Sequence, residues 1–227
     1  MNAVLQIKPR EMRMMSERIF SLGQMPKGFA LTLTDLPMYS QMQGLGGFAL
    51  MEQRQADFLH ADPRALRVAA EAGPDVTFDA AGQHAWVALP SVLDLLGEGC
   101  ARFGRACVTV IDVKDRKELE LAAGLGLRLG LKIGVDDLAL TAVPCAPADP
   151  VLDRALHAGT PIDADLWWRI YALARTALAP DTPASRRHAG VIIVTEDGTV
   201  IGRKDNDDDS DVSLLIRDRI DAEGPKA

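Results

Sequence analysis

The run of residues 107–113, Cys-Val-Thr-Val-Ile-Asp-Val, constrains the fold of this chain more than any other segment. It is compact, rich in β-branched side chains, and lies between two segments of helical character, residues 91–103 and residues 114–121. Apolar side chains on both faces of a strand, with helices before and after it, are typical of a buried parallel strand in a βαβ unit. The run therefore predicts an α/β fold.

Other short apolar segments supply further strands. Residues 76–78 predict a strand, and residues 85–87 predict a second one after an intervening turn. Two later runs, 131–135 and 138–143, contain the apolar and β-branched side chains of one or two more strands. Together with the central run they predict a small mixed sheet.

Two helical regions are expected before this sheet. An apolar residue recurs every three or four positions from Met12 to Leu22, after Pro9, which suits a first helical turn. This pattern predicts an amphipathic helix rather than a secretory signal. Residues 29–59 form a second helical region that Pro37 and a glycine-rich run divide into pieces. The fold class is thus α/β, with a small mixed sheet flanked by helices.

The last third of the chain differs from the rest in its local sequence patterns. Prolines interrupt regular structure at residues 144–150, which predicts a linker between a first part, residues 1–145, and a second part, residues 151–221. The second part is expected to contain a helix at residues 166–178 and a hairpin around Glu196-Asp197-Gly198. We expect it to complete the same fold as a C-terminal α+β segment.

Composition excludes several classes of function. Hydrophobic residues make up 48% of the chain, which predicts a globular fold, and the longest apolar runs are far shorter than the roughly 18 residues of a membrane span. The net charge is -7, and no cluster of Lys and Arg is interleaved with aromatic residues, so nucleic-acid binding is not expected. Three cysteines at no metal or redox spacing predict reduced thiols in a cytoplasmic protein.

The remaining motifs are incomplete. Gly124-Leu125-Gly126 approximates a nucleotide-binding loop but lies inside a helical pattern, so its glycines are interpreted as packing positions. The histidines have no metal-ligand spacing, and the aspartates between residues 205 and 211 lack the glycine and glutamate of a calcium loop. A solvated acidic loop is the better interpretation. The motifs predict no metal and no cofactor.

One local cluster suits an anionic ligand. Ser185-Arg186-Arg187-His188 offers hydroxyl and guanidinium donors to a carboxylate or phosphate, just before an apolar run. The alternative is a surface cluster of ion pairs with the acidic segment. A small carboxylate is the expected partner under the first interpretation.

The first two-thirds of the chain resembles the malate, sulfolactate and ureidoglycolate dehydrogenase family in the order of its elements, with residues 72–79 and 107–113 as the most similar stretches. The resemblance implies an NAD(P)-related fold that differs from the Rossmann fold, and it implies a homodimer. Where that family has its catalytic histidine, in a Ser-Asn-His motif, this chain has Val113, Lys114, Asp115 and Arg116. The family's second signature falls at residues 39–44, which contain no histidine. The resemblance therefore implies a catalytically degenerate relative.

The last third is similar to the C-terminal pattern of a bacterial family of unknown function. The similar positions run from Leu166-Trp167 through Ser185-Arg186 to the segment around residue 206. This resemblance implies no activity, but it adds acidic and amide groups to the candidate site. The candidate ligand-binding residues are Ser185, Arg186, Arg187, His188, Asp205, Asn206 and Asp207.

Three hypotheses follow. The first is a small-molecule binding protein or pseudoenzyme in which Arg186 holds the carboxylate of an organic acid. The second is an active enzyme on small metabolites, with Asp205 or His188 transferring a proton and Arg186 orienting the substrate. The third is a structural or interaction protein in which the helix with Trp167 and Trp168 docks a partner.

Overall fold

The chain divides into two compact units, Met1–Leu178 and Ala179–Ala227. The computed structural model describes residues 3–178, 193–194 and 200–201. The described helices all belong to the first unit, and the predicted boundary at residues 145–151 falls inside that unit.

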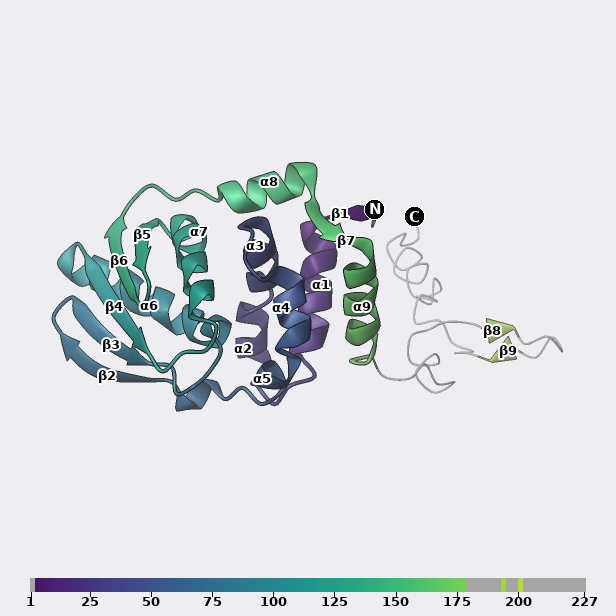
Figure 1. Cartoon of the computed structure of the whole chain (residues 1–227), viewed down its shortest axis with the longest axis horizontal. Coiled ribbons are helices and arrows are strands. Elements are labelled where there is room, and N and C mark those ends of the chain that lie inside the picture. Colours follow the sequence, from purple (N-terminus) through teal and green to yellow (C-terminus); the bar gives the residue numbers. More distant parts are fainter. Residues whose placement is uncertain (1–2, 179–192, 195–199, 202–227) are drawn as a thin grey trace, which may run out of the picture. The chain divides into compact units, whose positions relative to one another are not determined.

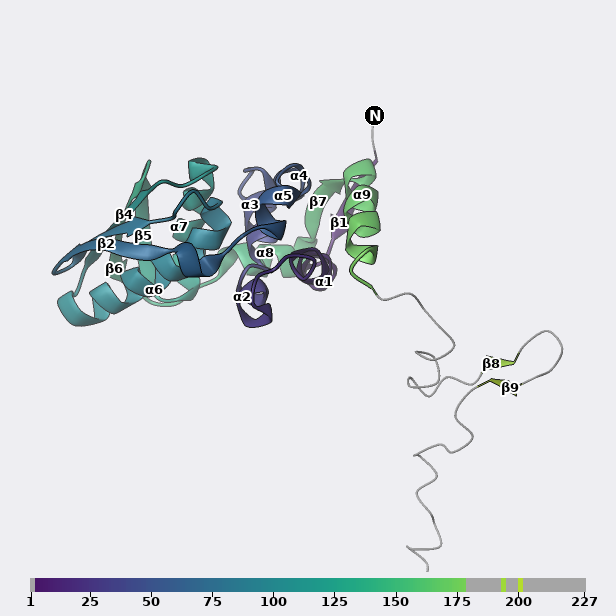
Figure 2. The same ribbon diagram turned by 90° about the horizontal axis from the view of Figure 1, so that it is seen from below.

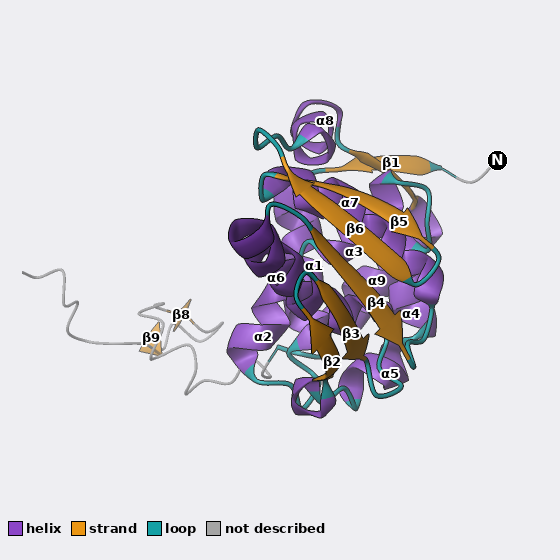
Figure 3. Ribbon diagram, turned by 90° about the vertical axis from the view of Figure 1, so that its left-hand side faces the viewer, coloured by secondary structure: helices purple, strands orange, loops and turns teal. Residues whose placement is uncertain are grey.

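A five-stranded mixed sheet forms one layer of the first unit (Figure 3). Its strands, in spatial order, are β2 (Arg67–Ala72), β3 (Asp75–Asp79), β4 (Ala106–Ile111), β6 (Ala139–Pro144) and β5 (Leu131–Asp136). The pair β3 and β4 is parallel, and the other neighbouring pairs are antiparallel. The predicted parallel strand at residues 107–113 and the predicted mixed sheet are confirmed.

The edge strand β2 differs from the others. Its register with β3 shifts between Val68 and Ala70, and the side chains of all its residues are exposed. Along β4, in contrast, buried and less buried side chains alternate, as a strand with one covered face requires.

The crossover between the parallel strands is α6 (Ala85–Phe103), which ends at Gly104 in the left-handed conformation, with φ of 73°. The prediction of a strand at residues 85–87 is wrong, because these residues form the first turn of α6. His84 caps this turn by accepting a hydrogen bond from the backbone N–H of Trp86. The side chains of residues 85–89 are all buried, so this part of the helix shows no amphipathic period.

Helices cover one face of the sheet. A 3₁₀ turn, η2 (Arg116–Glu120), leads into α7 (Leu121–Arg128); α6 packs against β4 and α7 against β5. The buried side chains Val108, Val110 and Leu140 of the central strands belong to the core on this side. On the opposite face Thr141 is exposed.

The remaining helices form a second layer beside α6 and α7 (Figure 1, Figure 2). They are α1 (Pro9–Phe20), α2 (Lys27–Thr32), α3 (Leu36–Met42), α4 (Gly47–Gln53), α5 (Gln55–Leu59), α8 (Pro150–Ala158) and α9 (Ala164–Arg175), with a 3₁₀ turn η1 (Pro63–Ala65). The predicted first helix and the divided helical region are confirmed. Pro37 and Pro150 stand in the first turns of α3 and α8, where the missing N–H costs nothing.

A two-stranded antiparallel sheet joins the beginning and the end of this layer. It pairs β1 (Val4–Ile7) with β7 (Thr160–Asp163). Asp163 then caps α9 by accepting a hydrogen bond from the backbone N–H of Leu166.

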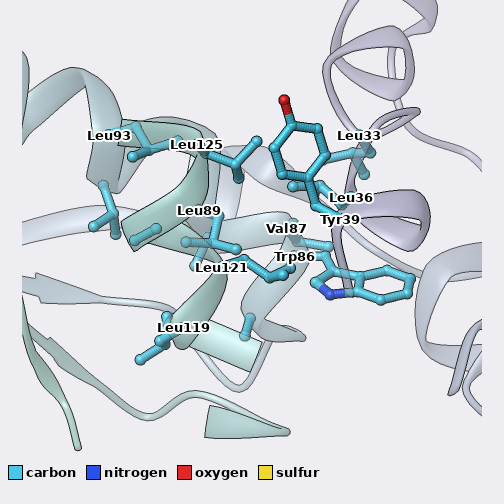
Figure 4. Packing of buried hydrophobic residues seen from close by; sticks show 14 of the residues in the cluster. Leu33, Leu36, Tyr39, Trp86, Val87, Leu89, Leu93, Leu119, Leu121 and Leu125 are labelled. Carbon is cyan, nitrogen blue, oxygen red and sulfur yellow. The ribbon is translucent and has the colours of Figure 1, made fainter. Parts of the chain in front are cut away.

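Leucines and aromatic residues join the two layers (Figure 4). Leu33, Leu36 and Tyr39 from the α2–α3 segment belong to the same buried cluster as Leu89 of α6 and Leu125 of α7. No helix in the described part of the chain has the length and apolar character to cross a bilayer.

In the second unit, β8 (Ile193–Val194) pairs antiparallel with β9 (Val200–Ile201). The predicted hairpin is confirmed for these four residues.

Candidate functional site

The seven residues of the predicted ligand site, Ser185, Arg186, Arg187, His188, Asp205, Asn206 and Asp207, lie outside the described residues. The anion-site interpretation of this cluster, and the alternative of an ion-pair cluster, therefore stay predictions. Among the cavities that the described residues line, two bring an ion pair and buried side chains together.

The first is a pocket between the two layers, with a volume of about 330 Å³. Its lining comes from three places: the α2–α3 segment, α6 and α7. Most of the lining is apolar, and Figure 4 shows Leu36, Leu93 and Leu125 among the side chains that meet here. The lining residues are Leu31, Thr32, Thr34, Asp35, Leu36, Pro90, Leu93, Asp94, Leu125, Arg128 and Leu129.

Helical spacing explains why charged and apolar side chains share this pocket. On α6, Pro90, Leu93 and Asp94 are three and four positions apart, so they lie on one face of the helix. The same spacing on α7 brings Arg128 beside Leu125. Leu93 and Leu125 are buried, while Asp94 and Arg128 are more exposed, so each helix contributes an apolar wall and one charged group.

Asp35 fixes the guanidinium of Arg128. Nη1 of Arg128 donates to Oδ2 of Asp35 at 2.7 Å, and Arg13 donates to the same carboxylate from Nε and Nη2. Burial by itself would raise the pKa of Asp35, but the hydrogen bonds and charges of the two arginines outweigh it and hold this pKa below its ordinary value. The carboxylate is therefore ionised at neutral pH and keeps Arg128 in place.

Tyr39 connects this ion-pair cluster to α8. Its hydroxyl donates to Oδ2 of Asp149 and also interacts with Arg128. Oδ1 of Asp149 accepts from the backbone N–H of Leu152 at 3.0 Å and so caps α8. Burial and the hydrogen bond to Asp149 raise the pKa of Tyr39, which stays a neutral donor. Arg128 thus stands in a network anchored on several helices.

The second place lies at the carboxyl end of the parallel strands β3 and β4, where α/β sheets commonly bind ligands. A cavity of about 230 Å³ is lined here by Asp57, His60, Gln83, His84 and Lys114, with Ala56 and Gly82. Next to it, the backbones of Asp112 and Asp115 have a φ of 49°, in the left-handed region that residues other than glycine rarely adopt.

His84 is the buried centre of this second cluster. Its Nδ1 accepts from the backbone N–H of Trp86 at 3.0 Å, so the neutral ring carries its proton on Nε2. Nε2 lies 3.4 Å from Oδ2 of Asp115, without the alignment of a hydrogen bond. Burial lowers the pKa of His84 to about 4, and the charges of Asp115 and Asp57 only partly offset this effect.

The cluster around His84 suits stability better than acid–base catalysis. The Nδ1 lone pair of His84 is taken by the helix cap, and Nε2 points to a carboxylate inside the protein. Arg54 pairs with Asp115 at 2.9 Å, and Lys114 pairs with Asp57 at 2.7 Å. These charges neutralise one another, so we take the pocket beside Arg128 as the candidate site.

Two sequence interpretations bear on other parts of the surface. Gly124 and Gly126 lie within α7, where Gly126 approaches β5 closely, which agrees with packing and not with a nucleotide loop. On α9, Trp167 is buried, whereas Trp168 is 58% exposed and packs edge-to-face on Tyr171. Docking of a partner on this helix stays a prediction.

Sequence reasoning did not select the residues of the candidate site. Asp35, Tyr39 and Arg128 are isolated charged or polar residues in their own segments. The one local signal was the spacing of Arg128 with Leu125 on a helical face, which marks a charged group at the border of a buried surface.

Comparisons with known proteins add a fold likeness. No family model matches the chain, and no curated protein matches it. Among solved structures, malate dehydrogenase from Entamoeba histolytica is 11% identical over 58% of this chain, with a TM-score of 0.44. Sulfolactate dehydrogenase from Methanocaldococcus jannaschii is 12% identical over 56%, with a TM-score of 0.41. The chain spans 38% of the length of each of these two proteins.

A malate/lactate dehydrogenase-like protein of E. coli is 12% identical over 98% of this chain and 84% of its own, with a TM-score of 0.47. These neighbours are of the dehydrogenase types that the sequence resemblance named. The similarity to a family of unknown function has no matching family model.

Proposed function

We propose that this chain binds a small organic acid in the pocket between α3, α6 and α7, with the carboxylate on Arg128 and the apolar body against the leucines. The observation that carries the proposal is the position of Arg128, a guanidinium that Asp35 holds at the border of a mostly apolar pocket of about 330 Å³. Such a combination of apolar walls and few convergent polar groups is typical of small-molecule sites.

The network leaves Arg128 able to bind a ligand. A guanidinium has five N–H donors, and Asp35 and Tyr39 do not use all of them. Since Arg128 is already fixed by these partners, a ligand carboxylate would not have to immobilise a free side chain. The remaining donors suit the two oxygens of a carboxylate.

We propose binding without hydride transfer, as in a catalytically degenerate relative of NAD(P)-dependent 2-hydroxyacid dehydrogenases. The sequence supports this, because Val113, Lys114, Asp115 and Arg116 stand where the resemblance places the catalytic histidine.

Calorimetric titration of the full chain with 4-methylpentanoate and with its neutral amide tests the proposal. The acid is expected to bind more tightly than the amide, and Arg128→Gln is expected to weaken binding of the acid by about 10- to 100-fold, the effect of losing a hydrogen bond between charged groups. Arg116→Gln is the matched control, because Arg116 forms an exposed ion pair with Asp137 and does not line the pocket.

Equal binding of the acid and the amide, or equal affinity of wild type and Arg128→Gln, would contradict the proposal. Arg186→Ala in the same titration separates it from the site predicted by the sequence. If Arg186→Ala abolishes binding and Arg128→Gln does not, the carboxylate binds in the C-terminal segment.

A further inference from the structure

We infer that the ligand of this pocket is an apolar α-amino acid, whose ammonium group is bound by Asp94 while its carboxylate is bound by Arg128. The inference rests on the proposed function, because it adds a second charged contact to the same site. It names the class of ligand that both charges and the apolar lining would accept together.

The availability of Asp94 is the first step. Its carboxylate lines the pocket from α6, and it has no ion pair or side-chain hydrogen bond within the described part of the chain. The other carboxylate of the lining, Asp35, already accepts hydrogen bonds from Arg13 and Arg128. Asp94 therefore has its full capacity to accept N–H donors from a ligand.

The charges around the pocket are the second step. Among the lining residues Arg128 is positive and Asp35 and Asp94 are negative, while Arg13, which is outside the lining, pairs with Asp35. A ligand with a carboxylate alone would place its negative charge in a pocket that also contains the unpaired Asp94. A zwitterion satisfies Arg128 and Asp94 at once and adds no net charge.

The arrangement of polar and apolar groups is the third step. Asp94 is adjacent in sequence to Leu93 on α6, and Arg128 lies one helical turn after Leu125 on α7. Each helix thus combines one charged group with a buried leucine. An apolar α-amino acid likewise combines two opposite charges with an apolar side chain.

Titration of the full chain with three related probes tests the inference. L-leucine has both charges, 4-methylpentanoate lacks the ammonium, and 3-methylbutylamine lacks the carboxylate. Leucine is expected to bind at least about 10-fold more tightly than either single-charge probe, as the loss of one charged hydrogen bond implies.

The variant Asp94→Asn assigns the contact. It is expected to weaken leucine binding by about 10-fold and to leave 4-methylpentanoate unchanged or bound more tightly, because the repulsion is removed. Asp137→Asn, at an exposed carboxylate outside this pocket, is the control and should change neither affinity.

The outcomes separate the two proposals. If leucine binds no better than 4-methylpentanoate, the amino-acid inference is overturned and the organic-acid function stands. If leucine binds better but Asp94→Asn does not weaken it, the role of Asp94 is overturned. If wild type binds none of the three probes, both proposals fail.

Discussion

The buried His84 makes the stability of the first unit depend on pH in a direction that the structure sets. The pKa of His84 falls from its ordinary 6.5 to about 4 on folding, since burial penalises the charged ring. Between these two values the unfolded chain takes up a proton that the folded chain does not bind, so stability falls as the pH decreases from about 6.5 to about 4. The full effect corresponds to about 3 kcal/mol, and about 2 kcal/mol is already lost at pH 5.

The variant His84→Asn isolates this effect. Asparagine is an efficient helix cap, so it can still accept the hydrogen bond from the backbone of Trp86, but it does not titrate. Urea unfolding of both proteins at several pH values, followed by circular dichroism, gives their difference in free energy of unfolding. We expect wild type to lose about 2 kcal/mol relative to the variant between pH 7 and pH 5.

Comparison with the variant cancels the contributions of groups that titrate in both proteins, including the other histidines. The neighbours Asp57, Asp115, Arg54 and Lys114 are present in both. A difference in free energy that stays constant with pH would refute the reasoning, since it would mean that His84 takes up its proton equally in the folded and unfolded chains.

Three further predictions concern packing, buried hydrogen bonds and ion pairs. Gly126→Ala places a Cβ against the buried side chain of Ile133 and 3.0 Å from the backbone oxygen of Leu131, so we expect a loss of about 2 kcal/mol in urea unfolding. Gly124→Ala, which meets the flexible end of Gln43, should cost less. Glu118 accepts hydrogen bonds from the indole of Trp86 and the backbone N–H of Gly46. Glu118→Ala should therefore lower the free energy of unfolding by about 3 kcal/mol, and Glu118→Gln should lower it less. Equal losses in the two variants would contradict this role. Because folding lowers the pKa of Asp35, its contribution to the free energy of unfolding is present at neutral pH and is lost as the pH falls through the folded pKa. The stability of Asp35→Asn should therefore depend less on acid pH than that of wild type. Equal acid sensitivity of the two proteins would argue against the ion pairs.

Local patterns sufficed for two of the elements. The compact β-branched run at residues 107–113 indicated a strand, and the recurrence of apolar residues every three or four positions indicated the first helix. The structure shows that only one face of the strand is covered, where the run predicted both. The first turn of α6 was not predicted as a helix, because its residues are buried on all sides and their apolar run shows no helical period. The strand β1 was also missed, because its partner β7 lies at the other end of the unit.

The candidate site could not be found in this way, because its contacts join distant segments. Arg128 and Asp35 are 93 positions apart, and Tyr39 and Asp149 are 110 positions apart. Sequence reasoning favours polar and charged residues that are adjacent, such as those from Ser185 to His188. It does not detect an isolated arginine that the fold brings to an isolated aspartate. The sequence prediction and the proposed pocket share one feature, a guanidinium offered to a carboxylate, and this pairing stays a prediction.

The shifted register of β2 bears on how copies of this chain meet at high concentration. An exposed strand at the border of a sheet offers its free backbone N–H and C=O groups to a strand of another molecule, which is a common route to aggregation. Here the irregularity between Val68 and Ala70 disturbs the regular spacing of those groups, and Arg67 and Glu71 place charges along the strand. Both features are ones that proteins use against uncontrolled sheet extension. A homodimer that joins two sheets through β2 is therefore disfavoured, and the predicted dimer contact is better sought on another surface.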